Sequence, residues 1–130
     1  MKTTTMIAIA RVLLGAIFTF AGLNGFLYLL GIEPIGATSL HVPFMQVLVS
    51  TPFVFVPLKT LELVAGIMLL TNRFVLLALL ILLPIGTNIL LFHLFADPSL
   101  LVNGIVVMVL LGLLLFHYRK HYAGLLVSKL

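Results

Sequence analysis

The sequence predicts an all-α integral membrane protein, a four-helix bundle that forms a single transmembrane domain. Of its 130 residues, 63% are hydrophobic and only 8% are charged, against roughly 25% charged residues in a typical soluble domain. A spanning helix needs about 20 apolar residues, and four runs approach or exceed that length: 6–30, 53–70, 74–95 and 100–116. These runs are continuous rather than alternating, which disfavours a transmembrane β-barrel.

The connections between the runs predict how the helices are arranged. The segments 71–73 and 96–99 are short, so the helices that they join must be antiparallel neighbours. The loop 31–52 is long and rich in Gly and Pro, which favour turns. Its middle, Pro43–Val49, is apolar but too short to span a bilayer. We expect a short interfacial helix there, with an unstructured loop as the alternative.

The distribution of basic residues predicts the orientation of the bundle. Loops 31–52 and 96–99 contain neither Lys nor Arg. Cytoplasmic loops are enriched in Lys and Arg, so we expect both termini in the cytoplasm and the loop 31–52 outside it. Of the seven Lys and Arg residues, all but Lys59 fall on the side of the termini: Lys2, Arg11, Arg73, Arg119, Lys120 and Lys129.

Charge and cysteine content limit the classes of function. The net charge of +4 comes from residues near the ends of apolar runs, not from a patch interleaved with aromatic residues. Nucleic acid is therefore not an expected partner, whereas the lipid bilayer is. The chain has no cysteine, which excludes a disulfide scaffold, thiol redox chemistry and a thiolate zinc site.

Polar side chains recur in the outer half of the predicted spans. With a rise of 1.5 Å per residue, Glu62 lies ~14 Å below the outer boundary, Asn88 ~11 Å, and Asn24 and Lys59 each ~9 Å, while His93 lies within ~5 Å of it. The inner halves are almost entirely apolar. This distribution predicts a polar pocket that opens outward, and it disfavours a proton-coupled transporter, which needs a polar path to the cytoplasm.

Lys59 and Glu62 are the charged pair of this layer. They are three residues apart, so they lie on the same face of a helix. A structural ion pair explains them, because pairing neutralises two charges that are costly inside a bilayer. Binding of a ligand or handling of protons is the alternative, since ionisable residues within membranes are often functional.

The neutral polar residues have structural and functional interpretations too. Asn24 and Asn88 can form hydrogen bonds between helices or contribute to the pocket. His93 is most simply an interfacial histidine bonded to a nearby carbonyl, with proton transfer or metal or haem ligation as alternatives. No second histidine lies at the same depth in another span, so neither haem nor a metal site is expected. On a straight helix Asn88 and His93 point ~140° apart, although Pro84 can kink that span.

Small residues predict where the helices approach closely. Gly15, Gly22 and Gly25 follow one stripe of the first span, and Gly66 lies one turn beyond Glu62 on the second. Small residues allow neighbouring helices to pack closely in membranes. Arg11 lies on the same stripe near the cytoplasmic boundary, where we expect its side chain to reach the interface.

Three segments carry a resemblance to a known family: RVLLGAIFTFAGLNG at 11–25, LKTLELVAGIMLLTNRF at 58–74 and PIGTNILLFHLFADP at 84–98. They resemble the DoxX and DoxX-like family of small four-span bacterial membrane proteins. The resemblance implies a multi-pass protein of the bacterial cytoplasmic (inner) membrane. Because the namesakes are described as quinone-reducing thiosulfate oxidoreductase subunits, it also implies a quinone-linked activity. The characteristic positions would be Arg11, Gly15, Gly22, Glu62 and Gly66.

Two functions are therefore compatible with the sequence. The first is a subunit of a quinone-linked membrane oxidoreductase that receives electrons from a partner redox protein. Its candidate ligand-binding or proton-handling residues are Glu62, Lys59, Asn24, Asn88 and His93. The second is a non-catalytic protein that binds a lipid or another small hydrophobic ligand, or that acts as a scaffold for a membrane complex. A homodimer is compatible with either function.

Overall fold

The computed structural model describes residues 2–36 and 38–129, and every regular element in these ranges is helical. Four helices are long and apolar enough to cross a membrane: α1 (Thr3–Leu29), α3 (Pro52–Leu70), α4 (Val75–Phe95) and α5 (Leu101–His117), the last preceded by the short 3₁₀ helix η1 (Pro98–Leu100). The prediction of four helices long and apolar enough to span a membrane is confirmed, with bounds shifted by a few residues. Which side of a membrane each end faces stays a prediction.

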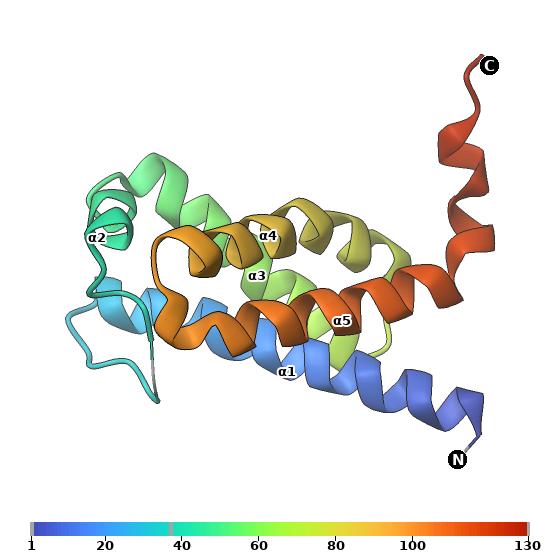
Figure 1. Ribbon diagram of the computed structural model, residues 1–130, viewed down its shortest axis with the longest axis horizontal. Coiled ribbons are helices and arrows are strands. Elements are labelled where there is room, and N and C mark those ends of the chain that lie inside the picture. The colour runs from blue at the N-terminus through green and yellow to red at the C-terminus, as the bar shows by residue number, and fades with distance from the viewer. Residues whose placement is uncertain (1, 37, 130) are drawn as a thin grey trace.

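The four long helices form a ring (Figure 1). The most extensive contact joins α1 to α3, followed by α4 with α5, and the pairs α1–α5 and α3–α4 close the ring. Both termini lie at the same end of the bundle. We call this the basic end, after the residues Lys2, Arg11, Arg73, Arg119, Lys120 and Lys129. The opposite end, formed by residues 30–36, 38–51 and 96–100, is the loop end.

The middle of the long loop is helical, as the first interpretation of Pro43–Val49 predicted. Helix α2 spans Pro43–Val49, and Pro43 occupies its first turn, where the missing N–H costs no hydrogen bond. It lies at the loop end of the bundle and contacts α3 (Figure 1). The alternative of an unstructured loop is wrong for these residues.

The turn between α3 and α4 needs two residues in the left-handed conformation. Asn72 and Phe74 have φ angles of 56° and 53°. The backbone N–H of Arg73 returns to the carbonyl of Met68 at 2.9 Å, which closes the end of α3. Asn is among the residues that tolerate this conformation best, so the four residues 71–74 can reverse the chain.

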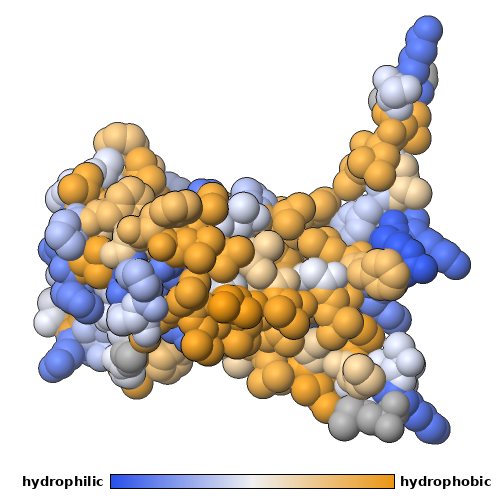
Figure 2. Space-filling view, in the orientation of Figure 1, coloured by the Kyte–Doolittle hydropathy of each residue, from blue (hydrophilic) through white to orange (hydrophobic). Residues whose placement is uncertain are grey.

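The apolar core fills the half of the bundle near the basic end. Its fully buried large side chains come from all four long helices and include Leu14, Phe18, Leu69, Leu79, Leu82, Leu111 and Leu114. The surface is hydrophobic around the middle of the bundle and hydrophilic towards both ends (Figure 2). This distribution is the one expected for a protein that lies across a bilayer.

Close packing of α1 against α3 depends on the predicted glycines. A Cβ atom at Gly22 would lie 2.7 Å from the backbone nitrogen of Leu63, and one at Gly66 would lie 2.5 Å from the backbone nitrogen of Thr19. At Gly15 the nearest atoms would be 3.0 Å away. These positions have no room for a side chain, so the glycines set the distance between the two helices.

Arg11 has a more specific role than the predicted reach towards the interface. Its guanidinium donates hydrogen bonds to the carbonyls of Leu69 and Leu70, the second at 3.5 Å. These carbonyls belong to the last turn of α3, where no further helical N–H groups are available. A cation at this position also interacts favourably with the helix dipole. Arg11 therefore caps α3 from α1.

We expect Gly22→Ala to destabilise the bundle. The added methyl group would collide with backbone atoms of Leu63, which cannot move without separating the helices. Overpacking of this kind costs about 1–3 kcal/mol. Unfolding in mixed micelles with increasing dodecyl sulfate measures the change.

The matched control is Gly112→Ala on α5, where a Cβ meets no atom within 4 Å. Because alanine has the higher helix propensity, this variant should be neutral or slightly stabilising. An equal loss of stability in both variants would contradict the role assigned to Gly22.

Candidate functional site

A cavity of about 1040 Å³ lies in the half of the bundle near the loop end. Its walls come from α1, α3, α4 and α5, and residues 38–40 and helix α2 contribute to the lining at the loop end. Most of the lining is apolar. All five candidate residues line it: Asn24, Lys59, Glu62, Asn88 and His93. The structure thus brings together the side chains that the sequence placed at similar depth.

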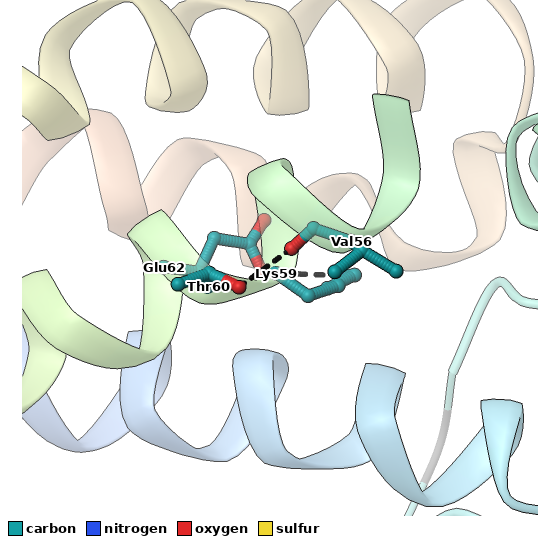
Figure 3. A network of polar contacts seen from close by, with 4 residues as sticks. All are labelled: Val56, Lys59, Thr60 and Glu62. Atoms are coloured by element: carbon teal, nitrogen blue, oxygen red, sulfur yellow. Dashed lines mark hydrogen bonds and ion pairs between the residues drawn. The ribbon is translucent and has the colours of Figure 1, made fainter. Parts of the chain in front are cut away.

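Lys59 and Glu62 form an ion pair within α3 (Figure 3). The Lys59 Nζ lies 3.1 Å from Glu62 Oε2. The two residues are buried, with 8% and 3% of their surface exposed. The Lys59 ammonium also lies 5.5 Å from the centre of the Phe55 ring, within cation–π range. The predicted pairing is confirmed.

Gly25 makes room for the lysine side chain. A Cβ atom there would lie 2.4–2.8 Å from Cγ, Cδ and Cε of Lys59. The stem of Lys59 therefore lies across Gly25 on α1, and the backbone of α1 shields it. Gly25 was predicted to allow close packing of helices. It does so against α3, where the atoms that it makes room for are those of the Lys59 side chain.

One oxygen of Glu62 is open to the cavity. Oε2 is paired with Lys59, while Oε1 has no hydrogen bond to any described residue. The only fully buried polar side-chain atom without a partner in the described ranges is Thr19 Oγ1, so Glu62 Oε1 retains accessible surface. Since Glu62 lines the cavity, this oxygen can accept a hydrogen bond from a molecule bound there.

Asn24 holds the long loop rather than a neighbouring helix. Its side-chain amide donates to the carbonyl of Ile35 at 2.8 Å and accepts from the N–H of Ile35 at 3.0 Å. Both polar groups of one loop residue are satisfied by one buried asparagine. The predicted hydrogen bond between helices is wrong for Asn24.

Asn88 bonds within its own helix. Its Nδ2 donates to the carbonyl of Pro84 at 3.0 Å, and the residue is exposed and lines the cavity. The predicted bond between helices is wrong here too. Helix α4 continues through Pro84 without interruption.

His93 is bonded to a nearby carbonyl, as its simplest interpretation predicted. Its Nδ1 lies 3.1 Å from the carbonyl oxygen of Asp97, and its ring meets the edge of Phe92 at 5.1 Å between centroids. The residue is buried. Within the described ranges, no three His, Cys, Asp or Glu residues are grouped so that they could hold a metal ion.

Asp97 is a buried polar residue that the sequence analysis missed. Its carboxylate accepts hydrogen bonds of 2.5 Å from both Ser39 and Ser99. These bonds, first from Ser39 and then from Ser99, lower the pKa of the Asp97 carboxyl below its ordinary value of 3.8. The sequence offered one hint of this role, because the hydroxyl of Ser99 lies only two residues from Asp97. The other partner, Ser39, lies 58 residues away and could not be predicted from spacing.

The loop is thus fastened to the bundle at several points. Asn24 holds Ile35 and Asp97 holds Ser39, while the Gln46 side chain of α2 donates to the hydroxyl of Tyr28 at 2.8 Å and to the carbonyl of Leu40. Because residues 38–40 and α2 line the cavity, these bonds hold one wall of the cavity in place.

Comparisons with known proteins add no relative to this picture. No family model matches the chain, and neither does any curated protein or solved structure. The function must therefore be argued from the geometry of the site.

Replacing Asn24 with Ala should loosen the loop. The variant leaves both backbone groups of Ile35 without their partner, at a cost of about 1–2 kcal/mol. Hydrogen exchange at the Ile35 amide should accelerate while exchange in the core helices stays slow. Asn88→Ala is the control, because that amide bonds only its own helix, and it should leave the Ile35 amide unchanged.

The contact between Asp97 and Ser39 should respond to acid and not to changes near neutral pH. A carboxyl whose pKa is lowered on folding binds fewer protons in the folded state, so its contribution is present above the ordinary value of 3.8. That contribution is lost as the pH falls through the lower value of the folded protein.

Hydrogen exchange at the Ile35 and Leu40 amides, compared between the native chain and Asp97→Asn at each pH, tests this prediction. The comparison cancels the intrinsic pH dependence of exchange. The difference between the two proteins should be constant around neutral pH and should shrink below about pH 4. A transition near pH 6 would instead assign the control of the loop to a histidine.

Proposed function

We propose that this protein is a DoxX-like multi-pass protein of the bacterial inner membrane whose cavity binds a lipid-soluble molecule of the quinone class. The termini would lie in the cytoplasm, following the distribution of Lys and Arg. In this proposal the chain is the membrane subunit of a quinone-linked oxidoreductase, and a partner redox protein supplies the electrons.

The observation that carries the proposal is a buried ion pair on the wall of a mostly apolar cavity. A volume of about 1040 Å³ is at the upper end of the range of about 300–1,000 Å³ for sites that bind small molecules. Such sites combine an apolar lining with a few polar groups that orient the ligand. A quinone has this composition, with a hydrophobic body and two carbonyl or hydroxyl oxygens.

The ion pair can bind both redox forms of such a molecule. The Lys59 ammonium has more than one N–H donor, and only its bond to Glu62 is formed here, so it can also donate to a carbonyl oxygen. Glu62 Oε1 can accept a hydrogen bond from a hydroxyl group and take up its proton. A bound quinone supplies the redox chemistry, while Lys59 and Glu62 orient its head group and handle protons.

A non-catalytic function is the second candidate, and the other polar residues favour it. Asn24 is engaged by the loop and His93 by the carbonyl of Asp97, so fewer groups are free for a reaction than the sequence indicated. A protein that binds a lipid or another small hydrophobic molecule needs only the cavity and no reactive group. A scaffold for a membrane complex needs neither. Either function is compatible with a homodimer.

The variants Glu62→Gln and Lys59→Gln/Glu62→Gln separate a ligand-binding role from a structural one. Glu62→Gln leaves Lys59 as an unpaired buried charge, which costs about 3–5 kcal/mol of stability. The double variant removes both charges and should recover most of that loss. Because Lys59 donates to the quinone carbonyl, the double variant should bind a short-chain ubiquinone analogue about tenfold or more weakly. Because Glu62 accepts from the quinol hydroxyl, Glu62→Gln should weaken binding of the corresponding ubiquinol by a similar factor, since hydrogen bonds to charged groups contribute about 1.5–3 kcal/mol.

Thr60→Val is the matched control for these measurements. Thr60 is exposed on α3, and its hydroxyl bonds only the carbonyl of Val56 (Figure 3), so the variant should leave binding and stability unchanged. If the double variant bound the analogue as tightly as the native chain, the pair would be purely structural and the proposal would fail.

Mass spectrometry of small molecules extracted from the purified protein distinguishes the two candidate functions. A stoichiometric quinone supports the oxidoreductase subunit. Phospholipid alone, with no absorbing cofactor in the visible spectrum, supports the non-catalytic protein.

A further inference from the structure

Positive charge is concentrated at the basic end without any acidic residue to balance it. The three acids of the chain are Glu33, Glu62 and Asp97, which lie in the long loop, on the cavity wall and between α4 and η1. In the described ranges, Lys59–Glu62 is the only ion pair. The exposed cations Lys2, Arg73, Arg119, Lys120 and Lys129 therefore require an anionic partner from outside the chain if they are to be paired.

The last residues of the chain turn away from α5. Residues 119–129, called the tail below, begin with the 3₁₀ helix η2 (Arg119–Leu126) and run across the axis of the bundle rather than along it (Figure 1). A segment that runs across the bundle axis is parallel to the surface of a bilayer that the four helices span. The tail starts directly after the last span, so it begins at the level of that surface.

The first residues of the tail are attached to the bundle. The hydroxyl of Tyr122 donates to the carbonyl of Leu76 on α4 at 2.8 Å. Arg119 donates to the carbonyl of Phe116 at 2.8 Å, and its guanidinium lies 4.1 Å from the centre of the Phe116 ring. These contacts hold the start of the tail at the ends of α4 and α5.

The end of the tail is apolar and has no protein cover. Leu125, Leu126 and Val127 are 65%, 85% and 55% exposed, and Lys120 and Lys129 flank them. They lie beyond the last span, so a tail extended into water would expose all three. At a bilayer interface the apolar side chains can insert at the acyl boundary while the lysines extend to the phosphates.

We propose that the tail binds the surface of the surrounding bilayer, with Leu125, Leu126 and Val127 inserted and Lys120 and Lys129 bound to anionic phospholipid head groups. The partner is the membrane that the bundle spans, because the tail is held at its level and runs parallel to it. This inference is independent of the ligand proposed for the cavity. An acidic protein is the competing partner for the same charges.

The absence of cysteine from the chain allows a direct measurement. Leu126→Cys introduces a single thiol at an exposed position, to which a nitroxide label can be attached. The labelled full-length protein is reconstituted in vesicles of phosphatidylcholine, with or without phosphatidylglycerol. Collision with oxygen, which concentrates in the bilayer, and with a water-soluble nickel chelate reports the depth of the label.

We expect the label to be protected from the nickel chelate in vesicles that contain phosphatidylglycerol and to become more accessible in phosphatidylcholine alone. Adding Lys120→Gln and Lys129→Gln should abolish the lipid dependence, since each cation near an anionic surface contributes about fivefold in binding. Arg73→Gln is the matched control, because it removes a cation from the same end but not from the tail, and it should preserve the lipid dependence.

Two outcomes would overturn the proposal. Equal accessibility of the label in both kinds of vesicle would show that anionic lipid does not bind the tail. Protection that requires an added acidic protein, such as a polyglutamate-rich carrier, would assign the tail to a protein partner instead. Because the lipid comparison uses the native charges, it does not depend on the folding of the lysine variants.

Discussion

The close approach of α1 to α3 is the constraint on which the rest of the structure depends. Gly22 and Gly66 meet backbone atoms of the opposite helix, so the two helices pack at a distance that no side chain would allow. At this distance the stem of Lys59 lies across Gly25, and its ammonium is held beside Glu62. The glycines therefore decide both how tightly the bundle is joined and where the buried ion pair Lys59–Glu62 is presented.

The two halves of the bundle use the same helices differently. Near the basic end, large apolar side chains from all four long helices fill the space between them, and Arg11 ties α1 to the end of α3. Near the loop end the space between the helices is a cavity, with residues 38–40 and α2 along its wall. A packed half supplies stability, which allows the other half to leave room for a ligand.

Three of the five candidate residues are each satisfied by a different partner, and this separates structural residues from the candidate site. Asn24 bonds the loop backbone, Asn88 its own helix, and His93 the carbonyl of Asp97. Glu62 differs because one of its oxygens has no bond to a described residue. Because this oxygen is accessible from the cavity, Glu62 is the candidate residue best placed to accept a hydrogen bond from a molecule bound there.

The sequence by itself determined the four spans and the common helix face of Lys59 and Glu62, because each depends on composition or on spacing along one helix. It left the helix Pro43–Val49 open beside an unstructured loop, and the structure decided for the helix. The tertiary structure decided the partners of Asn24, Asp97 and Arg11. Ile35 and Ser39 come from an irregular loop, and the α3 carbonyls that Arg11 caps lie 58 and 59 residues away from it. Helical periodicity encodes contacts within a helix, whereas the path of a loop across the end of a bundle has no repeat from which its contacts can be predicted.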